Sequence, residues 1–157
     1  MQVTTQLTQL DAKAVAALYD TDLYAWATTN AELLRQGKYQ QMDVGHLIEE
    51  IQDMGKSQQH AIASHLRNLL MHLLKWHFQP DKQNNSWKYT IRNARQEIDD
   101  VVQENPSLCA LPSKALARSY VKARQLAIDE TGLPAAMFPV DCPYVIEQVL
   151  SEDWLPS

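Results

Sequence analysis

Three histidines lie on one leucine-rich stretch of the sequence, and histidine serves metal binding and proton transfer near neutral pH. His65 and His72 are seven positions apart, so on a helix they project in almost the same direction. They are also about 10 Å apart along the helix axis, which is too far for two ligands of one metal ion. His77 follows His72 by five positions and does not align with it. The spacing therefore favours histidines at the edge of a core, each held by hydrogen bonds.

A metal site built from facing helices is the alternative chemistry. Glu50 and His72 would be its centre. Further ligands could come from Glu49, Asp53 or Asp22. His46 and Glu50 are four positions apart and could chelate a metal as a pair, but ordinary surface pairing is the simpler interpretation. Helical di-metal proteins carry paired Glu-x-x-His motifs, and the sequence contains none. We therefore expect no cofactor, with a divalent metal at these residues as the alternative.

Two arginines lie on helix faces that should point inward. Arg95 falls between Ile91 and Val102 around its predicted helix. Arg124 has the same relation to Tyr120. A guanidinium stays charged in proteins, so a buried one must meet carboxylates or carbonyl oxygens.

Glu50 is the carboxylate nearest to a buried face by helical angle. We therefore predict a buried polar cluster, and its members are Glu50, His72, Arg95 and Arg124. Such a cluster would fix the register between helices rather than catalyse a reaction. In the alternative, both arginines lie at the edges of their stripes, with packed stems and solvated heads.

The sequence contains no motif of a known catalytic centre. GxSxG, the P-loop, GxGxxG and HExxH are all absent. Without a nucleophile or a metal motif we assign no catalytic residue, and we favour a protein that is not an enzyme.

Charge is unevenly spread along the chain, whose net charge is -5. Residues 67–95 carry six basic residues and one acidic residue, whereas residues 1–53 carry eight acidic and three basic residues. Attraction between parts of one fold, or between subunits, explains this complementarity at least as well as a phosphate partner does. Lys75, Lys88 and Arg92 are the residues that a nucleic acid would contact, but the acidic chain makes that partner the least favoured.

Length and cysteine content limit the protein class. The 157 residues suit one domain with a full core. Cys109 and Cys142 lie in no CxxC motif, which favours a reducing compartment. No apolar run approaches the ~18 residues of a membrane span, and the first residues lack the pattern of a signal peptide. We expect a cytoplasmic protein that does not bind membranes.

Apolar residues recur with helical periodicity and predict an all-α chain. Residues 1–18 are expected to form an N-terminal arm with a short helix over 11–18, and residues 19–157 a single helical-bundle domain. The first long helix should begin near Asp20 to Asp22 and end before Gly37. The second should run from Asp43 to Phe78.

Two further helices complete the predicted up-and-down bundle of about four principal helices. One follows an N-cap at Ser86 and ends before Asn105, and the other lies between an N-cap at Ser113 and Gly132. A C-terminal appendage should contain a short helix over 144–150 and return Trp154 to the body. The connections are short, as in helical bundles.

The second helix carries one continuous apolar stripe. Its members are Val44, Leu47, Ile48, Ile51 and Met54, in phase with Ile62 to Trp76. We expect the whole stripe to be buried, with Gly55 on the buried face as the place for a bend in a helix about 54 Å long.

A series of residues resembles a known bacterial family. The series consists of Tyr19, Asp22, Trp26, LIEEI at 47–51, LLMHLLKW at 69–76, Trp87, Arg95, Arg124 and CPY at 142–144. It resembles the family catalogued as domain of unknown function 29, over about Leu18 to Trp154. The resemblance implies a cytosolic all-helical protein from bacteria, commonly cyanobacteria, and it implies no activity.

The favoured interpretation is a non-enzymatic helical protein of unknown function that binds another protein or itself. It depends on the missing catalytic motifs and on the complementary charges. A metal-binding bundle enzyme with inward Glu and His is the first alternative. A nucleic-acid accessory protein, whose binding would weaken steeply with salt, is the second.

Overall fold

The computed structural model describes residues 11–157, and these contain helices and no strand. The α-helices are α1 (Ala12–Thr21), α2 (Leu23–Arg35), α3 (Val44–Phe78), α4 (Asn85–Glu104), α5 (Leu111–Thr131) and α6 (Ile146–Leu150). Short 3₁₀ turns occur at η1 (Tyr39–Gln41), η2 (Pro80–Lys82), η3 (Pro106–Leu108) and η4 (Ala135–Met137). The all-α prediction with four principal helices, α2 to α5, is confirmed. No helix in the described part of the chain combines the length and the apolar character needed to cross a membrane.

Local sequence determines several of the helix ends. The Asp22 carboxylate accepts a hydrogen bond of 2.9 Å from the backbone N–H of Ala25 at the start of α2. Gly37 and Gly132 have φ of 71° and 67°, the left-handed conformation that ends a helix, after α2 and α5 respectively. These ends were predicted from the sequence.

The predicted N-caps of α4 and α5 are wrong by a few residues. Asn84, not Ser86, caps α4, because its extended backbone lets the side chain accept a hydrogen bond of 2.9 Å from the Trp87 N–H. α5 begins at Leu111 rather than after Ser113. Pro112 in the first turn of α5 has a fixed φ that suits a helix start, so the helix begins upstream of the serine.

The chain divides into two compact units, one ending at Gly55 and the other comprising Lys56–Ser157. The division falls inside α3, whereas the sequence predicts one domain over residues 19–157 after an arm. Residues 12–18 belong to α1, and Val15 in that helix is fully buried, so this part of the predicted arm is packed. Residues 1–10 of the predicted arm lie outside the described residues.

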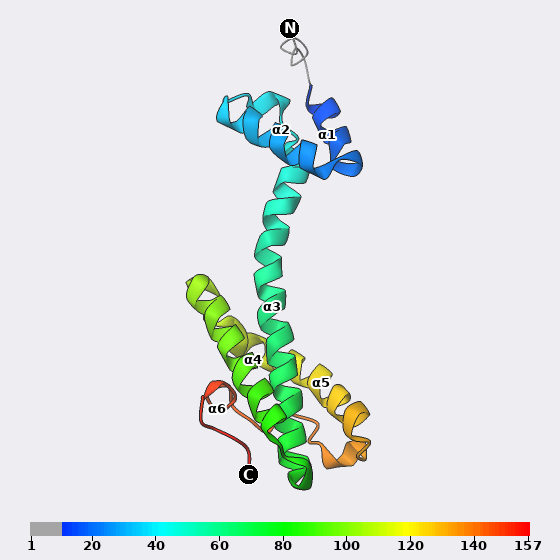
Figure 1. Cartoon of the computed structure of the whole chain (residues 1–157), viewed down its shortest axis with the longest axis vertical. Helices are drawn as coiled ribbons and strands as arrows, with labels where there is room; N and C mark the ends of the chain where they lie inside the picture. The colour runs from blue at the N-terminus through cyan, green and yellow to red at the C-terminus, as the bar shows by residue number, and fades with distance from the viewer. Residues whose placement is uncertain (1–10) are drawn as a thin grey trace. The chain divides into compact units, whose positions relative to one another are not determined.

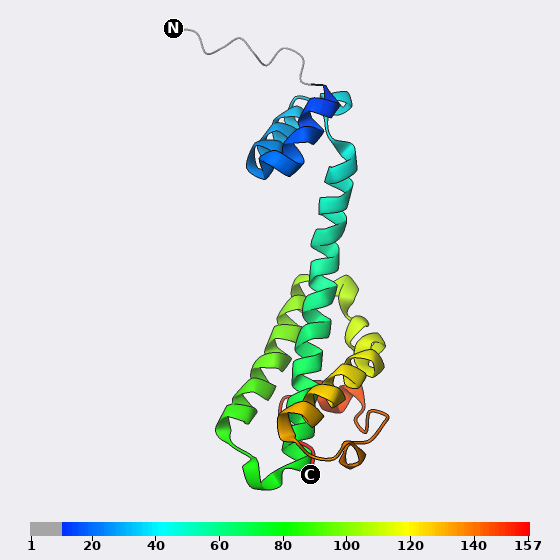
Figure 2. The same cartoon turned by 90° about the vertical axis from the view of Figure 1, so that its right-hand side faces the viewer.

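The first unit has a small core between α1, α2 and the turn before α3 (Figures 1 and 2). Its buried apolar side chains are Val15, Trp26, Leu33 and Met42. Asn30 is also buried, and its amide oxygen accepts a hydrogen bond of 2.9 Å from the Asp43 N–H. This bond ties the middle of α2 to the residue that precedes α3.

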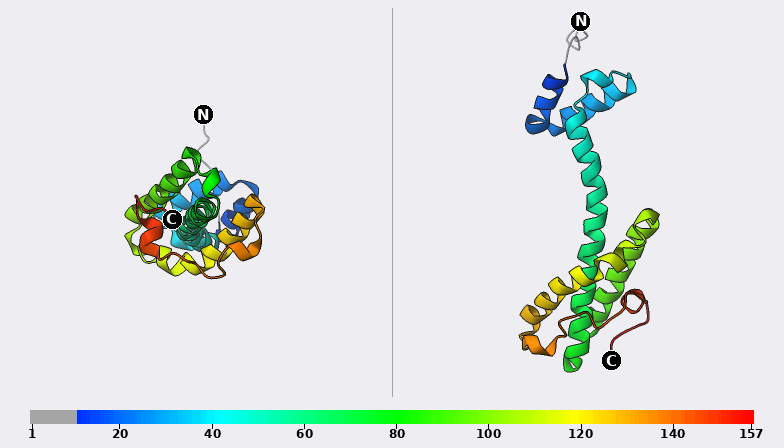
Figure 3. Two further views of the ribbon diagram at one scale, coloured as in Figure 1. Left: turned by 90° about the horizontal axis from the view of Figure 1, so that it is seen from below. Right: turned by 180° about the vertical axis from the view of Figure 1, so that it is seen from behind.

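The second unit contains the main core. α4 and α5 flank the C-terminal part of α3 on two sides (Figures 1 and 3). The fully buried side chains of α3 there are Ile62, Leu66, Leu69, Leu70, Leu73 and Leu74. The C-terminal segment after α5 adds Phe138, Tyr144 and Val149, and Trp154 packs against the same core as predicted.

The N-terminal part of α3 differs from the prediction. Val44 is 49% exposed, Ile48 50%, Ile51 67% and Met54 70%, although the sequence predicts all four to be buried. Gly55 is exposed as well, and α3 continues through it without interruption. The apolar period extends along the helix, but before Ile62 Leu47 is the one described member of the stripe that packs against a core, that of the first unit.

Candidate functional site

Arg95 fastens the C-terminal segment to α4. Its Nε donates a hydrogen bond of 2.8 Å to the Val149 carbonyl oxygen. Its Nη1 donates to the Glu152 carbonyl oxygen at 3.0 Å, and its Nη2 donates to the Trp154 carbonyl oxygen at 2.7 Å. The residue is 7% exposed, and burial lowers the pKa of the guanidinium. Three carbonyl oxygens thus solvate the buried charge. The sequence analysis predicted that a buried arginine would meet carboxylates or carbonyl oxygens, and Arg95 meets carbonyl oxygens.

Arg124 holds the loop that follows α5. Its Nε donates to the Phe138 carbonyl at 3.1 Å, and one terminal nitrogen donates to the Ala135 carbonyl at 2.8 Å. The Tyr120 hydroxyl donates to the neighbouring Pro139 carbonyl at 2.7 Å. Burial raises the pKa of Tyr120 to about 12, so this hydroxyl stays a donor. Both side chains therefore order the loop.

The histidines at the C-terminal part of α3 have separate partners. Nδ1 of His72 lies 2.9 Å from the Asn68 carbonyl oxygen, so that nitrogen carries the proton. Burial lowers the pKa of His72, which keeps the ring neutral. Nδ1 of His77 lies 3.0 Å from the Tyr144 hydroxyl. These contacts confirm the prediction of hydrogen-bonded core-edge histidines for His72 and His77. Nε2 of His65 lies 3.9 Å from a Glu97 carboxylate oxygen, which is beyond hydrogen-bond distance.

Glu50 belongs to a different network, in the first unit. The Tyr19 hydroxyl donates to a Glu50 carboxylate oxygen at 2.6 Å, and this bond raises the pKa of Tyr19 to about 12. The Tyr19 ring stacks on His46 with ring centroids 3.9 Å apart and meets Trp26 edge to face at 5.1 Å. Glu50 therefore anchors α1 to α3.

Asp43 is the centre of that network and was missed as a site residue. Its carboxylate accepts hydrogen bonds from Nε1 of Trp26 at 2.8 Å and from Nδ1 of His46. Burial raises the pKa of Asp43, but these hydrogen bonds outweigh burial, so the pKa is lowered overall. The bond to Asp43 raises the pKa of His46. A sequence signal existed, because the aspartate before a helix lies three positions before a histidine.

The four residues of the predicted cluster thus have four sets of partners. Arg95 and Arg124 bind different parts of the C-terminal segment, and His72 binds its own helix. Glu50 binds Tyr19 in the first unit. No hydrogen bond or ion pair among the described residues joins Arg95, Arg124 and His72 to one another. The angular positions of residues around a helix could not predict these partners. The arginines bind backbone carbonyl oxygens of the irregular C-terminal segment, which has no periodic sequence pattern.

The metal alternative stays a prediction. Within residues 11–157 no three His, Cys, Asp or Glu side chains are grouped as metal ligands. His46 and Glu50 lie one turn apart on α3, and each has a hydrogen-bond partner within the chain. His72 lies in the second unit, where it bonds to its own helix.

Two of the three predicted nucleic-acid contacts are engaged within the protein. Lys75 forms an ion pair with Glu130 at 2.6 Å, and its ammonium lies 4.7 Å from the centroid of the Trp87 ring. The ammonium of Lys88 likewise lies 5.5 Å from the centroid of the Trp76 ring. The two tryptophans are thus partners of lysines rather than open stacking platforms.

Arg92, the third predicted contact, lines a cavity of about 450 Å³ in the second unit. Glu152 and Asp153 line the same cavity, so its charges are mixed. This face is therefore a poor electrostatic match for a polyanion.

The exposed part of α3 provides a candidate interaction surface, which we call the α3 stripe. It consists of Val44, Ile48, Ile51 and Met54. At 100° per residue the first three fall within about 60° of one another, and Met54 lies about 60° beyond Ile51. Contiguous exposed apolar side chains on a helix are typical of sites that bind another protein.

Comparisons with known proteins define the family and no activity. No curated protein and no solved structure matches the chain. The model of the family described as Domain of unknown function DUF29 matches residues 18–155, almost the entire chain, and the protein therefore belongs to that family.

Proposed function

We propose that the protein is an interaction module that pairs with a second copy of itself through the α3 stripe. The observation that carries this proposal is the exposure of four large apolar side chains on one helix face, from 49% at Val44 to 70% at Met54. Complete burial of a large aliphatic side chain is worth about 1.5–3 kcal/mol. Four such side chains on each of two copies supply the apolar area that a helix-to-helix contact needs.

The spacing of the stripe supports a helix as the occupant. Val44, Ile48 and Ile51 are separated by four and then three positions, the alternation that forms the seam between paired helices. Gly55 continues this seam four positions later. A β-carbon built at Gly55 would meet nothing within 4 Å, so the backbone there is open to a neighbouring helix. Glycine in the middle of a helix is unfavourable by about 1 kcal/mol relative to alanine, and close approach of a partner helix explains its presence.

A second copy is the simplest partner that carries a matching stripe. In a two-fold symmetric pair the same patch serves both copies, so one exposed stripe meets its equivalent. A single substitution in the stripe then changes the contact at two symmetry-related places in the dimer.

The test is the mass of the full chain by sedimentation velocity over a wide range of concentrations. The wild type should form a dimer, and Ile51→Glu should weaken it about 100-fold, because two carboxylates would enter an apolar contact. Val140→Glu is the matched control, because Val140 is 77% exposed and lies outside the stripe. It should leave the dimer intact.

Two outcomes would overturn self-association. One is a wild-type chain that remains monomeric at its highest soluble concentration. The other is a dimer that Ile51→Glu does not weaken while circular dichroism shows both proteins equally helical.

The cysteines support action in a reducing compartment, and we place the protein in the bacterial cytoplasm. Cys109 and Cys142 are both free thiols. Burial raises the pKa of Cys142, which keeps this thiol protonated and unreactive. Fractionation of cells that express the protein without an added targeting sequence tests this location, and recovery from the periplasm would contradict it.

A further inference from the structure

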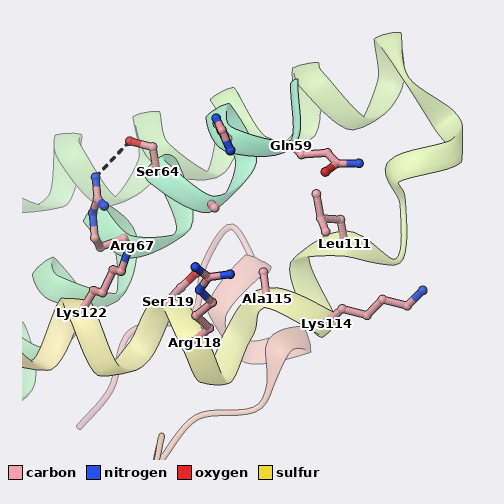
Figure 4. A pocket seen from close by; sticks show the side chains of 11 residues that line it. Gln59, Ser64, Arg67, Leu111, Lys114, Ala115, Arg118, Ser119 and Lys122 are labelled. Atoms are coloured by element: carbon pink, nitrogen blue, oxygen red, sulfur yellow. Dashed lines mark hydrogen bonds between the residues drawn. The ribbon is translucent and has the colours of Figure 1, made fainter. Parts of the chain in front are cut away.

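We propose that a groove between α3 and α5 binds a small molecule that carries two or more phosphate groups. The groove lies entirely in the second unit, has a volume of about 580 Å³ and is shown in Figure 4. This volume falls within the range of about 300–1,000 Å³ typical of small-molecule sites. The inference does not depend on the proposed dimer, whose stripe belongs to the first unit.

Four arginine and lysine side chains and no carboxylate line the groove among the described residues. The cations are Arg67 on α3 and Lys114, Arg118 and Lys122 on α5. No ion pair within the described residues neutralises any of the four. Elsewhere in the second unit, by contrast, Lys75 is paired with Glu130 and Arg95 is bound by three carbonyls. Convergent unpaired cations repel one another, and an anion in the groove would relieve that repulsion.

The spacing of the cations indicates more than one anionic group. Lys114, Arg118 and Lys122 follow one another at intervals of four, so they lie on one face of α5 over about 12 Å. In Figure 4, Lys122 and Arg67 lie together at one end of the groove and Lys114 extends at the other. One phosphate cannot contact both ends, whereas a ligand with two or three phosphates can.

A largely buried serine provides a second, independent indication of a ligand. Ser119 lines the groove, is only 5% exposed, and makes no hydrogen bond to another described residue. No fully buried side-chain oxygen among the described residues lacks a partner, so the Ser119 hydroxyl opens onto the groove rather than into the core. The oxygen of a bound phosphate would accept its hydrogen bond, between the flanking guanidinium and ammonium groups.

The remaining lining residues restrict the ligand class. Among the described residues no Phe, Tyr or Trp lines the groove, so it lacks the large aromatic platforms on which proteins usually stack successive bases. Leu111, Ala63 and Ala115 supply a small apolar wall. Arginine binds phosphate through two parallel hydrogen bonds, and phosphate offers a higher charge density than a carboxylate. These features favour a compact phosphorylated molecule over a nucleic acid or an acidic peptide.

Isothermal titration calorimetry of the full chain with sodium tripolyphosphate at low salt tests the proposal. We expect binding that weakens as salt is raised. Arg118→Gln should reduce the affinity at least about tenfold, since a charged hydrogen-bonding partner is lost. Ser119→Ala should reduce it about fivefold, which a purely electrostatic surface would not predict. Arg92→Gln is the matched control, because it removes the same charge from α4 outside the groove, and it should change the affinity less than about twofold.

Further arms distinguish other occupants. Absence of tripolyphosphate binding, or an equal loss with Arg118→Gln and Arg92→Gln, would overturn the site. Tighter binding of a poly-glutamate peptide or of a single-stranded oligothymidine, lost in Arg118→Gln, would overturn the small phosphorylated ligand in favour of that polymer. Weaker binding of both polymers than of tripolyphosphate would support the proposal.

Discussion

The two parts of α3 carry the same apolar period and have opposite environments. Ile62, Leu66 and Leu69 are fully buried, whereas Ile48 and Ile51 are half to two-thirds exposed. The difference is the presence of α4 and α5, which pack on the C-terminal part. Helical periodicity therefore identifies an apolar face, but it does not identify what covers that face. Where no described residue covers such a face, as at Ile48 and Ile51, a partner is the physical explanation that we propose.

The largest expected effect comes from comparing equivalent truncations in the two parts of α3. Leu69→Ala should destabilise the protein by about 3 kcal/mol, because it leaves a cavity in a fully buried site. Ile51→Ala should change the stability by less than about 0.5 kcal/mol at concentrations where the chain is monomeric. Urea denaturation followed by circular dichroism measures both. If Ile51→Ala were as destabilising as Leu69→Ala in the monomer, the α3 stripe would be packed in solution and the contrast would fail.

A second comparison concerns buried and exposed arginines. Arg95→Leu should destabilise the second unit by about 2–3 kcal/mol, since one buried and two partly buried carbonyl oxygens lose their charged donor. Arg118→Gln, which removes an arginine with no ion-pair partner among the described residues, should be nearly neutral, within about 0.5 kcal/mol.

Hydrogen exchange read by mass spectrometry separates the two variants further. Arg95→Leu should raise exchange throughout residues 146–157, whereas Arg118→Gln should not. Unchanged protection of that segment in Arg95→Leu would mean that packing alone holds it.

A smaller effect is expected from the link between α1 and α3. Tyr19→Phe removes the hydroxyl that donates to Glu50 while the ring contacts with His46 and Trp26 remain. Because the bond is partly exposed, the expected loss of stability is small and confined to the first unit. The chemical shifts of α1 amides in the variant measure this loosening. Tyr24→Phe, at an exposed tyrosine of α2, is the control and should leave them unchanged.

Local features of the fold were predictable from the sequence, and tertiary partners were not. The Asp22 cap, the Gly132 end and the buried positions from Ile62 to Trp76 follow from residue type and spacing over one or two turns. The carbonyl partners of Arg95 come from a segment more than fifty residues later that has no periodic pattern. No local signal could identify them.

The groove between α3 and α5 was predictable in part from the sequence. The spacing of Lys114, Arg118 and Lys122 is visible in the sequence and indicates a basic face on one helix. Its conversion into a cavity requires Arg67 and the neighbouring residues of α3 to lie opposite, which only the packing of α3 against α5 determines. Lys75 and Lys88, which the sequence suggested as nucleic-acid contacts, show the converse, because tertiary packing gives them partners within the protein that no local pattern reveals.

The smallest predicted effect is a pH dependence confined to the first unit. The pKa of Asp43 is lowered in the folded protein, so its contribution to stability is present above the unfolded value of 3.8 and is lost as pH falls through the lower folded value. The pKa of His46 is raised, so its contribution is fully present below 6.5 and is lost as pH rises through the higher folded value. The first unit should therefore be most stable between about pH 4 and 6.5.

NMR titration of the His46 ring protons should show its raised pKa, and Asp43→Asn should return that pKa toward 6.5. A His46 titration that Asp43→Asn does not alter would show that the aspartate is not its partner. The second unit provides the contrast, because burial lowers the pKa of His72, so the same titration should place His72 on the opposite side of 6.5.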